Sequence, residues 1–588
     1  MKRVLWFAAV VVVLIGAFVA VAQLISGSRE LASYFPDNAL LYIEAKDFHT
    51  LLKDWNSSEE KKLWIRGNDY EAFSRSRLFE RLGGAQGEFA AAATIATDTP
   101  FLSSVAGSQS ALALYDIGNL EFVYVTRMSE AQAQATPLWQ VRDKFEARTE
   151  GRMQFYVRQD QQSNRTAAFA VRDGWLILGT RADLVAGVLD RLQLATTRSL
   201  PDEPWYADSV KQASGSSQDS NRDLRMVLNL ERIVPSPYFR SYWVQRNITE
   251  MKQYRAAICD LHRGSQQYTE DRVLLRKAAG GNLPGGVEPL LALVPADAVF
   301  ASAQASPDVD RVVAELRENA LELKAAQERA AWSAPASAPI ENAGNAALLE
   351  ERIDAAPVVV EQSDPYQPLH ALLSTMQPTA ILEAYATHDE SDAMFVGIDH
   401  AVVLEASSSW DREAVGSALA AAMRPGLTVS QLGLGWISHS GEAGSYSTLD
   451  GSVSLAIAVR DHRLFLTTSA PLMQAMLEKE KAGDSTHADG ATYVAIFHHS
   501  PREQQAFRKI ALRLDAAGHI STSSQADAAN DSPGDASGQV PTFFTGNIVS
   551  LSRMFGNVAS ERVEERDEGS EVRQKVVYEW QSPSSAHP

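Results

Sequence analysis

Cys259 and His262 form the one close thiol–imidazole pair in the sequence, which holds a single cysteine. Residues three positions apart on a strand point to opposite faces, so this pair meets only if the strand bends. Free cysteine is also among the most buried residue types. We therefore expect Cys259 to be a packed thiol. A single cysteine excludes an intramolecular disulfide and argues against a thiolate metal site, which recruits several cysteines.

Histidine stands beside a second reactive residue in two further places. His498 and His499 are adjacent, and on an extended backbone they point to opposite faces, so they share a metal only if the chain bends. Asp399 and His400 have the composition of a proton relay, but no serine can be nominated as its nucleophile. Neither pair defines a site by itself.

Carboxylates are abundant, but their positions in the sequence do not show which of them converge. Residues 388–392 hold His388, Asp389, Glu390 and Asp392, which could contact a divalent ion, although acidic turns in an acidic protein are usually solvated. A glycosidase needs an acid and a base that converge in a cleft. Two close carboxylate pairs are Asp37 with Glu44 and Glu564 with Glu565.

The short motifs of familiar chemistries are absent from the chain. It has no Gly-x-Ser-x-Gly nucleophile elbow, no phosphate loop, no dinucleotide glycine fingerprint and no zinc-protease helix signature. The sequence therefore nominates no catalytic, cofactor-binding or metal-binding residue and no cofactor, and it favours a non-enzymatic protein over an enzyme.

Aromatic residues gather in one region of the sequence. Aromatic residues four apart on a helix share a face, and such stripes usually pack in a core or between domains. An aromatic surface for a partner or a glycan is the alternative. The residues are Trp205, Tyr206, Tyr238, Phe239, Tyr242 and Trp243.

Length and charge limit the classes of function. The chain has 588 residues, for which about two to four domains are expected. It carries 54 Lys and Arg against 73 Asp and Glu, a net charge of −19. Nucleic-acid affinity comes mostly from Lys and Arg that displace counterions, so nucleic acid is not an expected partner.

The N-terminus predicts an association with the cytoplasmic membrane. Val4–Ala22 is an unbroken apolar run, long enough to cross a hydrocarbon core of about 30 Å, and Lys2 and Arg3 precede it. Basic residues stay inside, which places the body of the chain outside the cytoplasm. Cleavage near Ala22, giving a secreted or periplasmic protein, is the alternative, because Ala20-Val21-Ala22 satisfies the small-x-small rule. A buried soluble helix is less favoured, since no polar face marks the run.

The remaining sequence describes one unit twice. Thr166–Thr180 reads as two strands joined at Asp173-Gly174, a dipeptide suited to a type I′ turn, and an apolar-periodic helix follows. Residues 454–478 repeat this pattern, and Ala170-Val-Arg-Asp173 recurs as Ala458-Val-Arg-Asp461. The predicted fold class is therefore α+β, an N-terminal transmembrane helix followed by two tandem copies of a mainly antiparallel sheet-plus-helix domain.

The predicted boundaries follow from this repeat. Residues 1–30 form the anchor and connector, 31–283 the first copy and 284–588 the second, with the boundary at Leu283-Pro284-Gly285-Gly286. The second copy has polar or Ala/Pro-rich insertions at about 332–367 and 516–540, which we expect to be flexible.

One segment resembles a group of bacterial envelope proteins known only as a domain of unknown function. It has an anchor before it and Trp55 downstream, and it reads Phe35-Pro-Asp-Asn-Ala-Leu-Leu-Tyr-Ile-Glu-Ala-Lys-Asp-Phe48. The resemblance extends loosely over residues 33–280. It implies a bacterial, membrane-tethered protein and supplies no activity and no catalytic residue.

Three functions follow from these observations. A non-enzymatic interaction or scaffolding protein of the cell envelope is the favoured hypothesis, and its partner would be an envelope protein or a glycan. A module that binds a small ligand or a glycan, and a carboxylate-dependent envelope hydrolase, are the alternatives. One fold can host binding and catalysis alike, so the repeat does not choose among them.

Overall fold

The computed structural model describes residues 30–58, 61, 65, 74, 76–193, 197–214, 222–242, 251–264, 267–281, 283–296, 298–321, 364–388, 397–427, 435–450, 455–482, 490–498 and 558–580. Most of the predicted insertion at 332–367, and all of the one at 516–540, lie outside these residues. So does Val4–Ala22. In the part that is described, no helix combines the length and the apolar character needed to cross a membrane.

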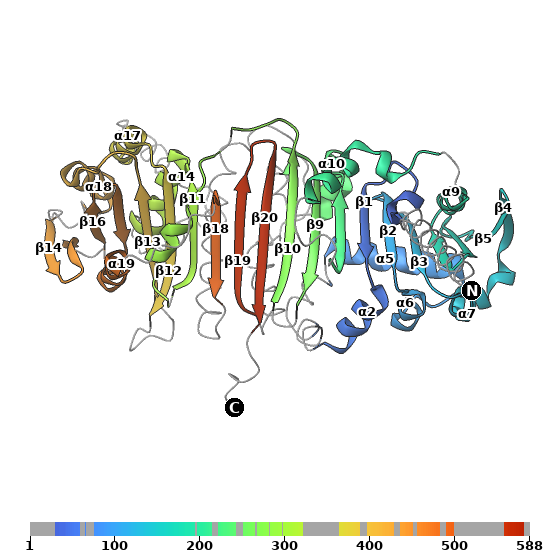
Figure 1. Ribbon diagram of the computed structural model, residues 1–588. Helices are drawn as coiled ribbons and strands as arrows, with labels where there is room; N and C mark the ends of the chain where they lie inside the picture. The colour runs from blue at the N-terminus through green and yellow to red at the C-terminus, as the bar shows by residue number, and fades with distance from the viewer. Residues whose placement is uncertain are drawn as a thin grey trace, which may run out of the picture. The chain divides into compact units, whose positions relative to one another are not determined.

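All strands of the described residues belong to one antiparallel sheet of 20 strands (Figure 1). The predicted fold class is therefore wrong in its two tandem sheet-plus-helix domains: one large sheet takes the place of two separate ones. The last strand of any sheet leaves backbone N–H and C=O groups unpaired. Period-two patterning locates a strand and its buried face but does not show which other strand its free edge joins. By its contacts the chain divides into two compact units, described here one at a time.

The first unit comprises Met1–Lys62, Glu71–Arg263 and Asp271–Ala278. Its strands pair in the order β4-β5-β6-β7-β3-β2-β1-β8-β9-β10, each neighbour antiparallel. The strands are β1 (Leu41–Ala45), β2 (Ser110–Asp116), β3 (Glu121–Arg127), β4 (Glu146–Glu150), β5 (Met153–Gln159), β6 (Thr166–Arg172), β7 (Trp175–Gly179), β8 (Leu224–Leu228), β9 (Tyr254–Arg263) and β10 (Gln267–Arg276).

Its helices begin and end as follows: η1 (Leu31–Tyr34), α2 (Phe48–Ser57), α5 (Arg77–Ala93), α6 (Thr99–Val105), α7 (Glu130–Ala135), α8 (Pro137–Gln140), η2 (Arg142–Lys144), α9 (Ala182–Leu192), η3 (Leu200–Asp202), α10 (Pro204–Ala213), α11 (Leu230–Ile233) and α12 (Pro237–Tyr242).

The hairpin β6–β7 forms where the sequence predicts it. Arg172 pairs with Trp175, and the two turn residues Asp173 and Gly174 have φ of 50° and 79°, as a type I′ turn requires. The expected helix follows as α9, which buries Val185, Val188 and Leu189.

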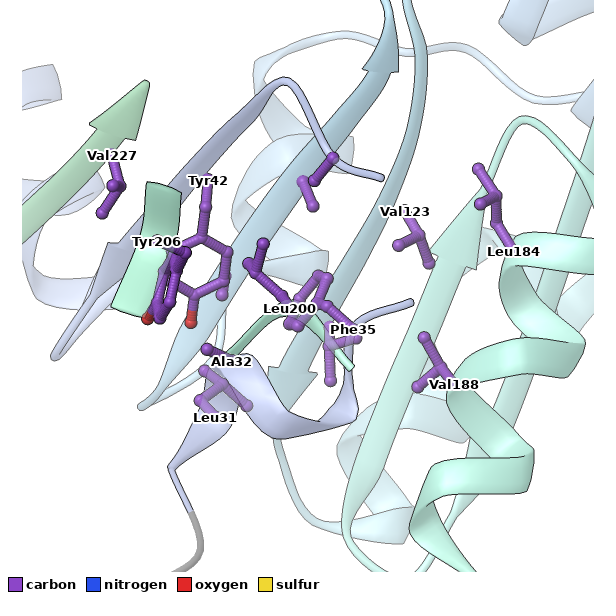
Figure 2. Close-up of a cluster of buried hydrophobic side chains, with 14 of the residues drawn as sticks. Leu31, Ala32, Phe35, Tyr42, Val123, Leu184, Val188, Leu200, Tyr206 and Val227 are labelled. Carbon is purple, nitrogen blue, oxygen red and sulfur yellow. The ribbon is translucent and has the colours of Figure 1, made fainter. Parts of the chain in front are cut away.

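Helices cover both faces of this part of the sheet, because its strands are apolar on both sides. Val123 and Val125 of β3 join a core with η1 and α9, whereas Phe122 and Tyr124 join a core with residues of α5, α6 and α7. Figure 2 shows the first of these cores, in which Phe35, Tyr42 and Tyr206 are almost completely buried. The rings of Tyr42 and Phe35 meet edge to face at 5.3 Å.

The second unit holds Leu63–Tyr70, Gly264–Glu270 and Ala279–Pro588. Its strands pair in the order β14-β15-β16-β17-β13-β12-β11-β18-β19-β20. Each strand number is ten higher than that of the strand in the same place in the first unit, so the two units have the same strand order. They are β11 (Ala298–Ala305), β12 (Ala380–His388), β13 (Gly397–Glu405), β14 (Gly435–Gly441), β15 (Gly444–Asp450), β16 (Ala456–Arg460), β17 (Arg463–Thr467), β18 (Tyr493–His498), β19 (Val558–Asp567) and β20 (Glu571–Trp580).

Helices again pack on both faces. Residues of α19 (Ala470–Ala482) and η5 (Glu288–Leu293) share one core with alternate sheet residues such as Val403. Residues of α14 (Val309–Leu316), η6 (Arg317–Leu321), α17 (Gln367–Met376) and α18 (Arg412–Leu427) share the other core with residues such as Val402. Neighbouring residues of one strand thus face opposite layers.

Candidate functional site

A hollow of about 300 Å³ lies between helices α2 and α6 of the first unit and is the candidate site. The size is at the lower end of ligand pockets, which run from about 300 to 1,000 Å³. Its lining combines an apolar side chain, two basic side chains and small polar ones. The lining residues are His49, Leu52, Lys53, Asn56, Ser57 and Ser103.

Helix α2 is held in place at its first turn. Asp47 is the N-cap, and its carboxylate accepts hydrogen bonds from the Thr50 N–H at 3.0 Å and the Thr50 hydroxyl at 2.8 Å. The bond from the Thr50 N–H lowers the pKa of Asp47. The His49 N–H donates to the carbonyl oxygen of Gly107 at 3.1 Å, and Phe48 packs against the core. The start of the helix is therefore fixed to the unit.

The rest of α2 is only partly covered. None of its ten residues is fully buried, although it carries Phe48, Leu51, Leu52 and Trp55. Positions 49, 52, 53 and 56 are spaced as one helix face, which explains why they line the hollow together. Trp55 remains 40% exposed.

Helix α6 supplies the other wall. Asp98 caps it by accepting the Phe101 N–H at 3.0 Å, and Phe101 and Val105 point into the core. Those two residues fix the helix so that Leu102 and Ser103 face outward; Leu102 is 44% exposed. The hollow is thus walled by two capped helices that carry incompletely covered apolar side chains.

The lining of the hollow offers basic, hydroxyl and apolar groups to a ligand. Its lining has no carboxylate and no thiol. The Ser57 hydroxyl is already engaged, because it donates to the carbonyl oxygens of Lys53 and Asp54, each at 3.1 Å. The cationic groups are Lys53 and, when protonated, His49, while Lys61 donates to the side chain of Asn56. Basic groups beside apolar surface favour an anionic, partly apolar partner.

A second feature with unusual chemistry is a carboxyl pair in the second unit. Glu315 lies on α14, and its Oε2 accepts a hydrogen bond from Asn319 of η6 at 2.9 Å. Glu383 lies on β12. Burial raises the pKa of Glu383 to about 7; the charge of Glu315 adds to this rise and that of Arg311 opposes it. Burial also raises the pKa of Glu315. The pair can therefore hold a proton near neutral pH.

Tyr493 on β18 lies close enough to this pair for the charge of Glu383 to change its pKa. Burial raises its pKa to about 12, and the charge of Glu383 adds to the rise. The pair and the tyrosine all belong to the second unit.

The thiol–imidazole pair is not brought together. Burial along β9 alternates, with Tyr254, Ala256, Ile258 and Asp260 inward, so Cys259 and His262 belong to opposite faces. Cys259 is half-buried, and the His262 Nε2 lies 3.4 Å from an Asp271 oxygen.

Asp399 and His400 do not form a relay with each other, because adjacent strand residues face opposite sides. His400 is buried on β13, and its ring centroid lies 4.6 Å from that of Tyr385. The backbone N–H of His400 donates to the Thr468 hydroxyl at 2.8 Å. His388 and His498 end their strands, and residues 389–392 and His499 lie outside the described residues. Among the residues that the structure describes, no group of three or more His, Cys, Asp or Glu side chains is placed to bind a metal.

The two close carboxylate pairs have separate structural partners. Glu44 accepts the Tyr42 hydroxyl at 2.9 Å, while Asp37 lies 4.0 Å from the Arg198 guanidinium. Glu564 pairs with Arg566 at 3.1 Å, and Glu565 accepts from Gln574 at 2.7 Å.

The aromatic region packs mostly inward. Trp205 and Tyr206 are buried on α10 and meet edge to face at 5.9 Å, and Phe239 is buried, whereas Tyr238 is 50% exposed. Trp243 lies outside the described residues.

Sequence reasoning missed a buried ion pair, Arg225 on β8 with Asp260 on β9. Two hydrogen bonds of 2.6 Å join the guanidinium to the carboxylate, and both side chains are almost completely buried. The residues face each other directly across the two strands. No local pattern could reveal the pair, because its members are 35 positions apart.

Comparison with known proteins gives no family for this chain. No family model matches it, and no curated protein matches it. Crystal forms I and III of TP0453 are similar to part of it, each with a TM-score of 0.23, at 10% and 9% identity. The match covers 44% of this chain and 82% and 84% of the two TP0453 chains. A TM-score this low does not establish a shared fold.

Proposed function

We propose that this protein is a non-enzymatic interaction protein of the cell envelope, and that the α2–α6 surface binds a protein partner with acidic and apolar side chains. The observation that supports this is the hollow itself: exposed Trp55 and Leu102 belong to its two helices, and Lys53 lines it. Apolar anchors surrounded by polar residues are typical of protein-binding surfaces.

The partner's chemistry follows from the charges. Lys53 and His49 lie in the lining, and no acidic side chain is among the lining residues. A carboxylate of the partner is attracted by these basic groups. Apolar side chains of the partner add binding free energy by covering Leu52 and Leu102. A partner that was only acidic would be repelled by the rest of a chain of net charge −19.

Photocrosslinking from position 103 tests this function. Ser103 is exposed and lines the hollow, so p-benzoylphenylalanine placed there faces a bound partner. We expect one crosslinked product of fixed mass from intact cells, reduced in the Lys53→Glu background. The matched control is the same probe at Lys211, an exposed position of α10 in the same unit. Equal labelling from both positions would contradict the proposal.

A small ligand is the competing occupant, and a second measurement separates it from a protein. Decanoate, an apolar chain with one carboxylate, is added to the purified full chain in a thermal-shift assay. A ligand that binds only the folded state raises the unfolding temperature. We expect no shift; a saturable shift that is lost in Lys53→Glu would replace the protein partner with a small amphipathic anion.

The membrane association remains a proposal and has its own test. We expect the full chain in the membrane fraction, with the body exposed outside the cytoplasm, because Lys2 and Arg3 precede the apolar run Val4–Ala22. Deletion of residues 1–30 is expected to leave the body in the cytosol. Sequencing the mature N-terminus distinguishes a retained anchor from cleavage near Ala22, and a full chain recovered from the cytosol would contradict both.

A further inference from the structure

Strand β14 is an edge strand of the second unit. It pairs with β15 along its whole length, from Gly435 with Asp450 to Gly441 with Gly444, and with no other strand of the described residues. Figure 1 draws it as the outermost strand of that unit. An edge strand offers a row of free backbone N–H and C=O groups to another chain.

The corresponding edge strand of the first unit is protected by charge. Among the described strands β4 pairs with β5 alone, and it carries Glu146, Arg148 and Glu150 among its five residues. Arg148 also forms an ion pair with Glu146 at 3.0 Å. Charged side chains on an edge disfavour pairing with another strand, because they would have to lose their water.

β14 lacks this protection. Its seven residues, Gly-Trp-Ile-Ser-His-Ser-Gly, include no charged side chain and no proline. Most of them are exposed, and Ile437 is 46% exposed. Short, uncharged strands that contain β-branched and aromatic residues are the kind that other strands join.

One side chain on each face of β14 has a partner within the unit. The His439 ring stacks on Tyr446 at 4.9 Å, and its Nε2 lies 2.7 Å from the Thr448 hydroxyl. On the other face Arg412 donates to the Ser438 hydroxyl at 3.2 Å. These contacts and the pairing with β15 hold β14 in an extended conformation, which lowers the entropy cost of adding a neighbouring strand.

We propose that β14 pairs antiparallel with β14 of a second copy of this chain and so forms a two-fold symmetric dimer. Pairing centred on Ile437 sets this residue against its own copy and Trp436 against Ser438. No charged side chain of β14 then faces another. The pairing joins Gly435–His439 of one β14 to the same residues of the other, and because β4 is charged, the dimer closes instead of growing into a fibre.

The interface is small, so the dimer forms reversibly. A strand of seven residues buries less surface than the roughly 1,200 Å² typical of stable complexes. We expect a monomer–dimer equilibrium that shifts with protein concentration. This inference does not depend on the α2–α6 surface.

Sedimentation velocity of the full chain in mild detergent, over a concentration series, tests the dimer. We expect Ile437→Lys to raise the dimer dissociation constant at least about tenfold, since it puts a charge on the edge and removes an apolar contact. The matched control, Thr149→Lys on β4, adds the same charge to the edge that is already protected and is expected to leave the equilibrium unchanged. Far-UV circular dichroism checks that both variants keep their fold.

Disulfide trapping checks the register. In a Cys259→Ser background, Ile437→Cys is expected to give a covalent dimer under mild oxidation, whereas Gly441→Cys, displaced from the two-fold axis, is not. A parent chain that stays monomeric at every concentration would overturn the proposal, and so would a dimer that Ile437→Lys leaves intact.

Discussion

Asp260→Ala is expected to destabilise the first unit by about 3–5 kcal/mol, the largest loss that we expect from one substitution, because it removes the carboxylate that neutralises a buried guanidinium. Arg225 and Asp260 are joined by two hydrogen bonds of 2.6 Å and are almost completely buried. Urea unfolding followed by circular dichroism measures the loss, and hydrogen exchange of the β8 and β9 amides localises it.

Two further variants test the physical reason. Replacing both partners by apolar residues, as in Arg225→Met with Asp260→Leu, is expected to cost much less than Asp260→Ala alone, because no unpaired charge is left in the core. Asp183→Asn removes a partner from the exposed pair Arg181–Asp183, for which less than about 1 kcal/mol is expected. A double variant as unstable as Asp260→Ala would show that the loss comes from packing.

The pH dependence of stability is expected to change in Glu383→Gln. The pKa of Glu383 is raised in the folded protein to about 7, because its carboxyl group is buried beside Glu315. A raised folded-state pKa means that the protonated form favours folding. That contribution is fully present below the ordinary carboxyl pKa and is lost as the pH rises through about 7. Above this pH the charged carboxylate costs the folded state stability.

Glutamine mimics the protonated carboxyl group. We therefore expect Glu383→Gln to have a free energy of unfolding about 2–3 kcal/mol higher than that of the parent chain at pH 8, and almost the same one at pH 4.5. Denaturant unfolding at both pH values measures this difference. Glu413→Gln, an exposed residue of α18, is the control for the same change of net charge. An equal effect of Glu383→Gln at the two pH values would show that its carboxyl titrates normally.

Local features of the fold could be predicted from the sequence. Asp173-Gly174 forms the hairpin turn, because aspartate and glycine tolerate the positive φ angles that it needs. The opposite faces of Cys259 and His262 also follow from strand geometry alone. These predictions succeed because each depends on neighbouring residues only.

Long-range features could not be predicted in the same way. Two separate domains were expected, whereas the strands join one sheet, since the pairing of strands distant in sequence leaves no local pattern. The sequence does indicate that helices cover both faces of the sheet. Ala167–Ala170 is an uninterrupted apolar run, which is typical of a strand buried on both sides, and it is buried throughout.

The candidate site was missed for a related reason. Trp55 entered the sequence analysis only through the resemblance. Nothing in the sequence shows that α6 lies beside α2 with Leu102 exposed. Likewise, Glu315 and Glu383 are neighbours only because α14 packs over β12.

The measurement that tests the central claim most directly is the yield of the position-103 crosslink in intact cells, compared between the parent chain and Leu102→Asp. If the α2–α6 surface binds a protein with acidic and apolar side chains, placing a carboxylate at this exposed apolar position is expected to lower the yield at least about tenfold, a loss of about 1.4 kcal/mol or more. The same product at undiminished yield in Leu102→Asp would contradict the account.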